Sequence, residues 1–120
     1  MSVPVDLDAL GVLVDELGPE ALLTTITRSS TPHVVSVLVT WVDGHLNLGG
    51  GRRTQANIAV NPRVTVIWPR VREDAYRLIV DGIATGGDDE PITITPTLAI
   101  LHRIAGIEVD GPNCVPIERA

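Results

Sequence analysis

Hydrophobic residues alternate with polar ones, or gather in short β-branched runs, along most of this chain, and both patterns are typical of strands. The clearest case is HVVSVLVTWV (residues 33–42), in which alternate side chains separate into two faces. One face carries valines and Trp41, which predicts that it lies in the core. The other face mixes valine and leucine with Ser36 and Thr40, so we expect it to meet solvent, a partner or a ligand.

Further strands are predicted by the same two patterns, with turn residues between them. Asp43-Gly44 predicts a two-residue hairpin turn after the strand 33–42. Gly82 predicts a bulge, and Pro96 requires an edge position or a bulge because proline has no N–H to donate. The predicted ranges are 21–27, 45–49, 63–68, 76–85 and 92–101, with a short additional strand at 107–109.

The segment 6–19 has helical spacing, because its leucines and one valine recur on a single face. Asp6 or Asp8 can cap its first turn by accepting hydrogen bonds from free N–H groups, and Gly18 followed by Pro19 ends it. With one more short helix after the third strand, the elements predict a mainly β protein. Tight turns between most strands favour a closed antiparallel barrel over a sandwich, because closure removes exposed edges.

The short second helix lies within GGGRRTQANIAVNP (residues 49–62), which joins two predicted strands. We expect Thr54 to be its N-cap and the range 55–60 to form under two turns, with both alanines and the last valine packed on the barrel. Gly51 and the two glycines before it let the backbone come close to a ligand. Arg52 and Arg53 carry guanidinium groups that match phosphate oxygens in pairs.

This segment is therefore a candidate anion site, and the alternative is a loop that only links two strands. It is neither a P-loop, which ends in GK[ST], nor a G-x-G-x-x-G dinucleotide fingerprint. A helix this short binds phosphate weakly through its dipole alone, so the arginines have to contribute most of the attraction.

Composition narrows the classes of function. Hydrophobic residues make up 44% of the 120 residues, so we expect one domain over 1–120 with a folded core. The net charge of −6 argues against nucleic acid or an anionic membrane surface as a partner. The N-terminus MSVPVDLDAL has no signal-peptide pattern and no apolar run is long enough to cross a bilayer, so we expect a cytoplasmic protein. The histidines have no metal-ligand spacing, and we expect no metal site.

The order of these motifs resembles a known family. TTITRSSTPHVVSVLVTWVDGHLNL, a basic turn, the N-x-x-x-N-P motif at 57–62 and a VTVIW strand are similar to the flavin-binding split β-barrel proteins. These form the pyridoxamine 5′-phosphate oxidase-like superfamily, which includes the F-420-dependent reductases of actinobacteria. The resemblance covers about residues 21–85 and implies a six- or seven-stranded antiparallel split β-barrel that forms a homodimer.

The resemblance also implies a cofactor, FMN or the deazaflavin coenzyme F-420, in a groove between subunits. Its phosphate is expected at Arg52, Arg53, Thr54 and Asn57, although many relatives have a lysine where this chain has Thr54. The strand after the S-x-P turn is expected beside the flavin, with backbone contacts from its centre and hydroxyl donors at its polar positions. That strand contributes Ser36, Val37, Leu38, Val39 and Thr40.

Two classes of function follow from the resemblance. The first is an oxidoreductase that transfers hydride to a small planar or conjugated substrate, with chemistry supplied by the cofactor. The second is a non-catalytic carrier or sensor of such a cofactor. Trp68 either stacks on the bound ring or packs inside the barrel. Ser36 and Thr40 either donate to the cofactor or form a polar dimer seam or solvent face.

Overall fold

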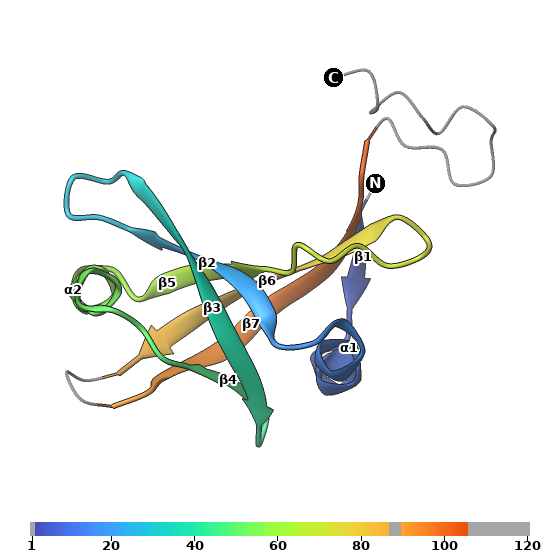
Figure 1. Cartoon of the computed structure of the whole chain (residues 1–120), viewed down its shortest axis with the longest axis horizontal. Helices are drawn as coiled ribbons and strands as arrows, with labels where there is room; N and C mark the ends of the chain where they lie inside the picture. The colour runs from blue at the N-terminus through green and yellow to red at the C-terminus, as the bar shows by residue number, and fades with distance from the viewer. Residues whose placement is uncertain (1, 87–89, 106–120) are drawn as a thin grey trace.

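An antiparallel barrel forms the body of the molecule, which is a computed structural model (Figure 1). The structure describes residues 2–86 and 90–105, so the predicted strand at 107–109 lies outside the described residues. The barrel follows the order β7-β4-β3-β2-β5-β6 and closes by pairing β6 with β7, while β1 lies outside the barrel on β7. The strands are β1 (Ser2–Val5), β2 (Glu20–Ile26), β3 (Pro32–Val42), β4 (His45–Leu48), β5 (Arg63–Ile67), β6 (Tyr76–Thr85) and β7 (Ile92–Arg103).

The mainly β barrel with two helices is confirmed, and the second helix follows the third of the predicted strands, β4. The first strand, β1, was not predicted. It is four residues long and exposed for most of its length, so it carries no alternating pattern that would mark it.

The N-terminal helix is built as its sequence predicts. A short 3₁₀ turn η1 (Leu7–Ala9) leads into α1 (Leu10–Leu17), and the side chain of Asp6 accepts a hydrogen bond from the N–H of Asp8 at 3.0 Å. Gly18 ends the helix with a φ of +88°, a conformation that glycine adopts without steric cost. The buried side of α1 faces the barrel.

Two irregular positions in the strands are also confirmed. Asp43 and Gly44 both have positive φ, 49° and 83°, as a type I′ hairpin turn between β3 and β4 requires. The register of β6 on β7 shifts after Asp81, where Gly82 pairs with Pro96. The bulge accommodates the proline inside a strand that otherwise pairs along its length.

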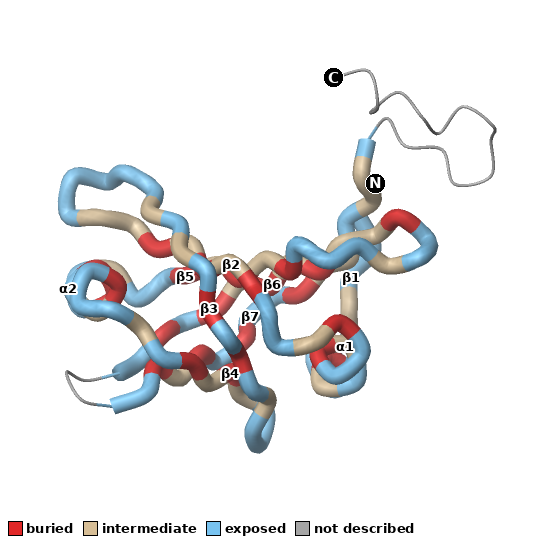
Figure 2. The backbone as a smooth tube through the Cα atoms, in the orientation of Figure 1, coloured by how far each residue is buried: buried red, intermediate tan, exposed pale blue. Residues whose placement is uncertain are grey.

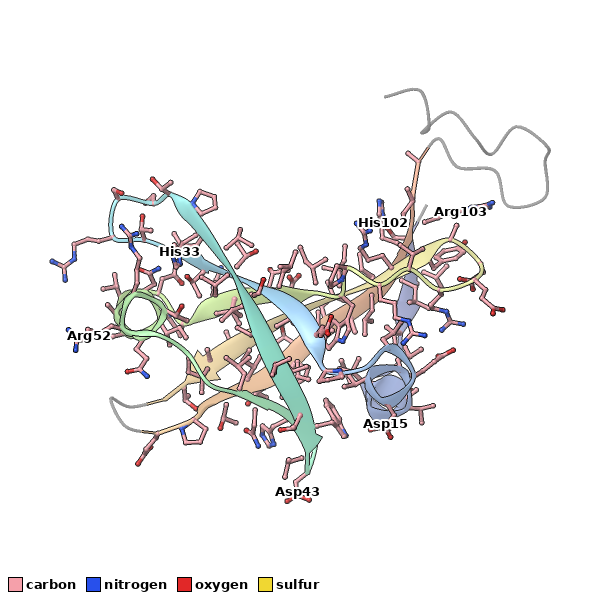
Figure 3. The ribbon with its side chains drawn as sticks, viewed as in Figure 1. Asp15, His33, Asp43, Arg52, His102 and Arg103 are labelled. Atoms are coloured by element: carbon pink, nitrogen blue, oxygen red, sulfur yellow. The ribbon has the colours of Figure 1, made fainter. Side chains whose placement is uncertain are left out.

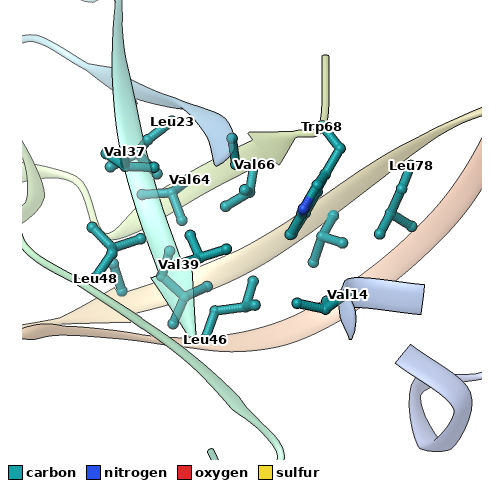
Figure 4. Packing of buried hydrophobic residues seen from close by; sticks show 14 of the residues in the cluster. Val14, Leu23, Val37, Val39, Leu46, Leu48, Val64, Val66, Trp68 and Leu78 are labelled. Atoms are coloured by element: carbon teal, nitrogen blue, oxygen red, sulfur yellow. The ribbon is translucent and has the colours of Figure 1, made fainter. Parts of the chain in front are cut away.

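Buried residues alternate with more exposed ones along the barrel strands (Figure 2), and the buried hydrophobic side chains form one core (Figure 4). Along β3, buried Val37 and Val39 alternate with exposed neighbours, which confirms the two faces expected of this strand. Trp68 is the largest fully buried side chain, and its Nε1 donates a hydrogen bond to the carbonyl oxygen of Gly18 at 3.0 Å. This bond ties the end of α1 to the barrel interior.

The second helix, α2 (Arg52–Val60), differs from the prediction in its start and in its buried side. It begins three residues earlier, with Gly51 as N-cap, so the assignment of Thr54 as N-cap was wrong. The predicted packing side, which ends at Val60, is exposed. The helix instead buries Thr54, Asn57 and Ile58, which share one side at helical spacing. The hydrophobic pattern predicted the wrong buried side of this helix because two of the three buried residues are polar.

No helix in the described part of the chain is long and apolar enough to span a membrane.

Candidate functional site

The N-terminal end of α2 presents unpaired donors and positive charge together. The N-cap, Gly51, has no side chain that could accept hydrogen bonds from the first turn, and the first helical bond runs from the N–H of Gln55 to the Gly51 carbonyl at 3.0 Å. The N–H groups of the three residues between them therefore have no partner within the helix. No acidic residue lies in this first turn, and Arg52 and Arg53 are both exposed. Arg52 points away from the barrel (Figure 3).

The three glycines before α2 have different surroundings. A Cβ on Gly50 would collide with the side chain of Ile92 and approach Thr54 Cγ2 to 3.3 Å, so this glycine allows the turn to pack on β7. A Cβ on Gly49 or Gly51 would meet nothing within 4 Å. Gly50 is thus needed for packing, while the open space at Gly49 and Gly51 leaves room beside the free N–H groups.

Asn57 links the buried side of α2 to the barrel. Its Nδ2 donates a hydrogen bond to Oγ1 of Thr25 on β2 at 3.0 Å, and both residues are buried. Thr25 pairs with His33 on β3, so these two side chains lie on the same inward face of the sheet. Within the described residues, Nδ1 of His33 is buried and has no hydrogen-bond partner. Asn57 and the buried Thr54 therefore support the helix, and the arginines face the solvent.

The predicted strand segment on β3 presents alternate residues to the outside. Ser36, Leu38 and Thr40 are exposed, whereas the side chains of Val37 and Val39 are 8% and 2% exposed and belong to the core. Those valines can offer only backbone atoms to a ligand. The hydroxyl of Thr40 donates to a backbone carbonyl of β4 at 3.5 Å, and no bond of the Ser36 hydroxyl is found in the described part of the chain.

An open groove of about 340 Å³ lies beside the centre of β3. Ser36 and Leu38 form one wall of the groove, and Pro69 and residues of β2 form the rest. No residue of α2 lines it, so one chain does not bring the arginines and the β3 segment into a single cavity. Sequence reasoning missed Pro69, which has no side-chain chemistry to mark it.

Trp68 does not reach either part of this surface, because none of its side chain is exposed and its indole N–H is already bonded inside the protein. The structure therefore favours the alternative in which Trp68 packs inside the barrel. Among residues 2–86 and 90–105, no group of three or more His, Cys, Asp or Glu side chains could hold a metal ion.

The fold has many solved counterparts. An F420 reductase aligns with a TM-score of 0.57 and 19% identity, over 68% of this chain and 88% of its own. A putative pyridoxamine 5′-phosphate oxidase of Listeria innocua aligns with a TM-score of 0.64 and 16% identity, over 80% and 98% of the two chains. An FAD-binding protein of Mesorhizobium loti aligns with a TM-score of 0.63 and 16% identity, over 84% and 96%. The chain thus has the split-barrel fold of the pyridoxamine 5′-phosphate oxidase-like proteins, as the resemblance implied.

Two curated sequences define the family more closely. The uncharacterized proteins Mb0449c of Mycobacterium bovis and MT0457 of Mycobacterium tuberculosis are each 34% identical to this chain over 118 residues. The alignment covers 84% of this chain and 82% of each relative. The chain belongs to the family of these mycobacterial proteins. No family model matches the sequence.

Proposed function

We propose that this protein is an oxidoreductase that binds coenzyme F-420 or FMN in a groove between two subunits and reduces a small planar or conjugated substrate. The observation that carries the proposal is the N-terminal end of α2, where unpaired N–H groups and two exposed arginines lie together without an acidic neighbour in the turn. Solved proteins of the same fold include one named as an F420 reductase and one named as FAD-binding, which supports a flavin-type ligand.

The first turn of α2 suits a phosphate group. Its N–H groups and the helix dipole favour an anion, and guanidinium groups add charge-assisted hydrogen bonds. Arg52 and Arg53 would contact the phosphate in place of the lysine that many proteins of the resembling family have. The Asn57–Thr25 hydrogen bond holds the helix against the barrel, so the donors keep their positions while the ligand binds.

The exposed face of β3 suits a planar ring and a second subunit. Val34 and Leu38 are 54% and 68% exposed on it, which is costly for a strand that stays in water. A second copy covering this face would bring the Ser36 hydroxyl and the backbone of Val37 and Val39 into a closed groove. Dimerisation would also supply the wall that one chain lacks between α2 and β3.

A bound flavin or deazaflavin supplies the hydride chemistry. The chain then has to bind the phosphate, orient the ring and exclude water, for which backbone groups, hydroxyls and apolar side chains are sufficient. The same surface also suits a carrier or sensor, since Ser36, Leu38 and Thr40 on the outer face of β3 provide no acid or base for proton transfer, and the ionisable residue that lines the groove is Glu20 on β2.

The test is direct titration of the purified protein with FMN and with F-420, followed by fluorescence. We expect Arg52→Ala combined with Arg53→Ala to raise the dissociation constant by roughly 30- to 150-fold. Arg103→Ala is the control, because Arg103 lies at the opposite end of the molecule from Arg52 (Figure 3). Absence of micromolar binding to either cofactor would overturn the proposal. Binding without turnover of any acceptor in a broad panel would favour the carrier or sensor.

A further inference from the structure

An open groove of about 510 Å³ crosses the outside of the barrel on β2, β5 and β6, with a contribution from β7. The groove is called the Asp81 face here. It combines the isoleucines Ile26 and Ile83 with the charged residues Arg63 and Asp81 and with threonines of three strands.

Apolar side chains continue the Asp81 face on both sides. Val34 pairs with Thr24, Thr24 with Thr65, Thr65 with Asp81, and Asp81 with Leu98, so these residues form one row across the outer surface. Val34 and Leu98, at the two ends of the row, are 54% and 51% exposed. The row follows four of the six strand-to-strand steps around the closed barrel, so Val34 and Leu98 adjoin the Asp81 face at its edges and face different directions. The isoleucines of the groove itself, of which Ile83 is 38% exposed, are the apolar part that a partner would cover.

Arg63 and Asp81 have no ionic partner in the described part of the chain. The carboxylate of Asp81 accepts a hydrogen bond from Oγ1 of Thr65 at 2.7 Å, which fixes its orientation in the groove. Arg63 pairs with Ile83, and Thr65 pairs with Asp81, so the two charged residues are diagonal neighbours on one face. The salt bridges found among described residues involve Arg72, and neither Arg63 nor Asp81 joins one.

We propose that the Asp81 face is where two copies of this chain meet, and that Arg63 of each subunit pairs with Asp81 of the other across a two-fold axis. The proposal rests on the homodimer of the proposed function and adds the residues that set its geometry. In a two-fold interface, a contact from one residue to another occurs twice with the subunits exchanged. Opposite charges that are adjacent but unpaired on one subunit are self-complementary under that symmetry.

Charge is the reason for choosing a second copy as the occupant. A net charge of −6 opposes self-association, and a contact surface that carries both signs adds no further like-charge repulsion. The Asp81 face carries one residue of each sign, beside two isoleucines and three threonines. Two such faces give two equivalent ion pairs within a contact of mixed polarity.

The test uses Arg63→Asp and Asp81→Arg, separately and mixed, with dimer affinity measured by analytical ultracentrifugation. Each variant alone places like charges opposite each other at two sites, and we expect its dissociation constant to rise at least about a hundredfold. A mixture of the two variants forms a heterodimer with two ion pairs, one in the native orientation and one reversed. We therefore expect the mixture and the double variant R63D/D81R to dimerise within about tenfold of the wild type.

Circular dichroism first establishes that each variant is folded. If Asp81→Arg fails to fold, Arg63→Gln and Asp81→Asn are used, and their effects on dimer affinity should be strongly non-additive. Unchanged affinity in the single variants, no recovery in the mixture, or additive effects of the neutral variants would each overturn the ion pair.

A wild type that stays monomeric at all concentrations would overturn the ion pair and the dimer of the proposed function together. A wild-type dimer that these substitutions leave intact would overturn only the ion pair. Cofactor titration of the same samples reports separately on the site at α2.

Discussion

The buried hydrogen bond between Thr25 and Asn57 offers a sharp test of how α2 is held. Thr25→Val keeps the shape of the side chain but removes the acceptor of the Asn57 Nδ2 donor, which lies 3.0 Å away. Thr25 is 1% exposed and Asn57 7%, so water cannot replace the lost partner without a rearrangement. An unsatisfied buried donor costs about 1–3 kcal/mol, which for a domain of this size lowers the melting temperature by roughly 5–15 °C.

Two companion variants separate the hydrogen bond from packing. Thr25→Ser keeps the hydroxyl and loses one methyl group, for which we expect about 1 kcal/mol. The double variant T25V/N57L replaces both polar partners with apolar groups and should recover much of the stability lost in T25V. Thermal and urea unfolding followed by circular dichroism measure these differences. A T25V protein within about 0.5 kcal/mol of the wild type, or a Ser variant that is as unstable as the Val variant, would refute the reasoning.

Three further substitutions test other parts of the structure. Trp68→Phe should lower the free energy of unfolding by about 1–3 kcal/mol, because the partly buried carbonyl of Gly18 loses its donor; denaturant unfolding measures it, and an unchanged midpoint would contradict this role. Gly82→Ala should cost about 1–3 kcal/mol, since its Cβ would lie 2.6 Å from a side-chain carbon of β7, whereas Gly49→Ala, with nothing within 4 Å, is the matched control. Arg72→Ala should change stability by less than about 1 kcal/mol, because its ion pairs at 3.5 and 3.6 Å involve half-exposed carboxylates; a larger loss in thermal melting would show that the guanidinium has a structural role.

Much of the barrel could be predicted from the sequence because local chemistry and tertiary packing agree there. Asp43-Gly44 supplies the two positive φ angles of a hairpin turn, and alternation along β3 matches one buried and one exposed face. β1 could not be predicted, because its partners on β7 lie about a hundred residues away and its own residues are mostly exposed. The pairing of β1 with β7 joins segments that are distant in the sequence, so the residues of β1 carry no local pattern that predicts it.

The residues of the candidate site stay a prediction, whereas the fold is confirmed. Arg52 and Arg53 stand out in a chain of acidic net charge, and the structure leaves both exposed at a helix start. Thr54 and Asn57 are expected at the cofactor phosphate, and both lie on the buried side of α2, so their contact with a ligand stays a prediction. The hydrogen bond of Asn57 to Thr25 could not be predicted, because nothing in the local sequence identifies a partner on a distant strand.

The pairing of β7 with three other strands has a consequence for biosynthesis. Ser2 on β1 and His102 on β7 are 100 residues apart and share a hydrogen bond, and β7 also joins β4 and β6. A ribosome must therefore synthesise nearly all of the described chain before the barrel can close. Until then, β4 and β6 are open edges that other chains can pair with. We expect the yield of native protein to depend on elongation rate and on chaperones that shield these edges.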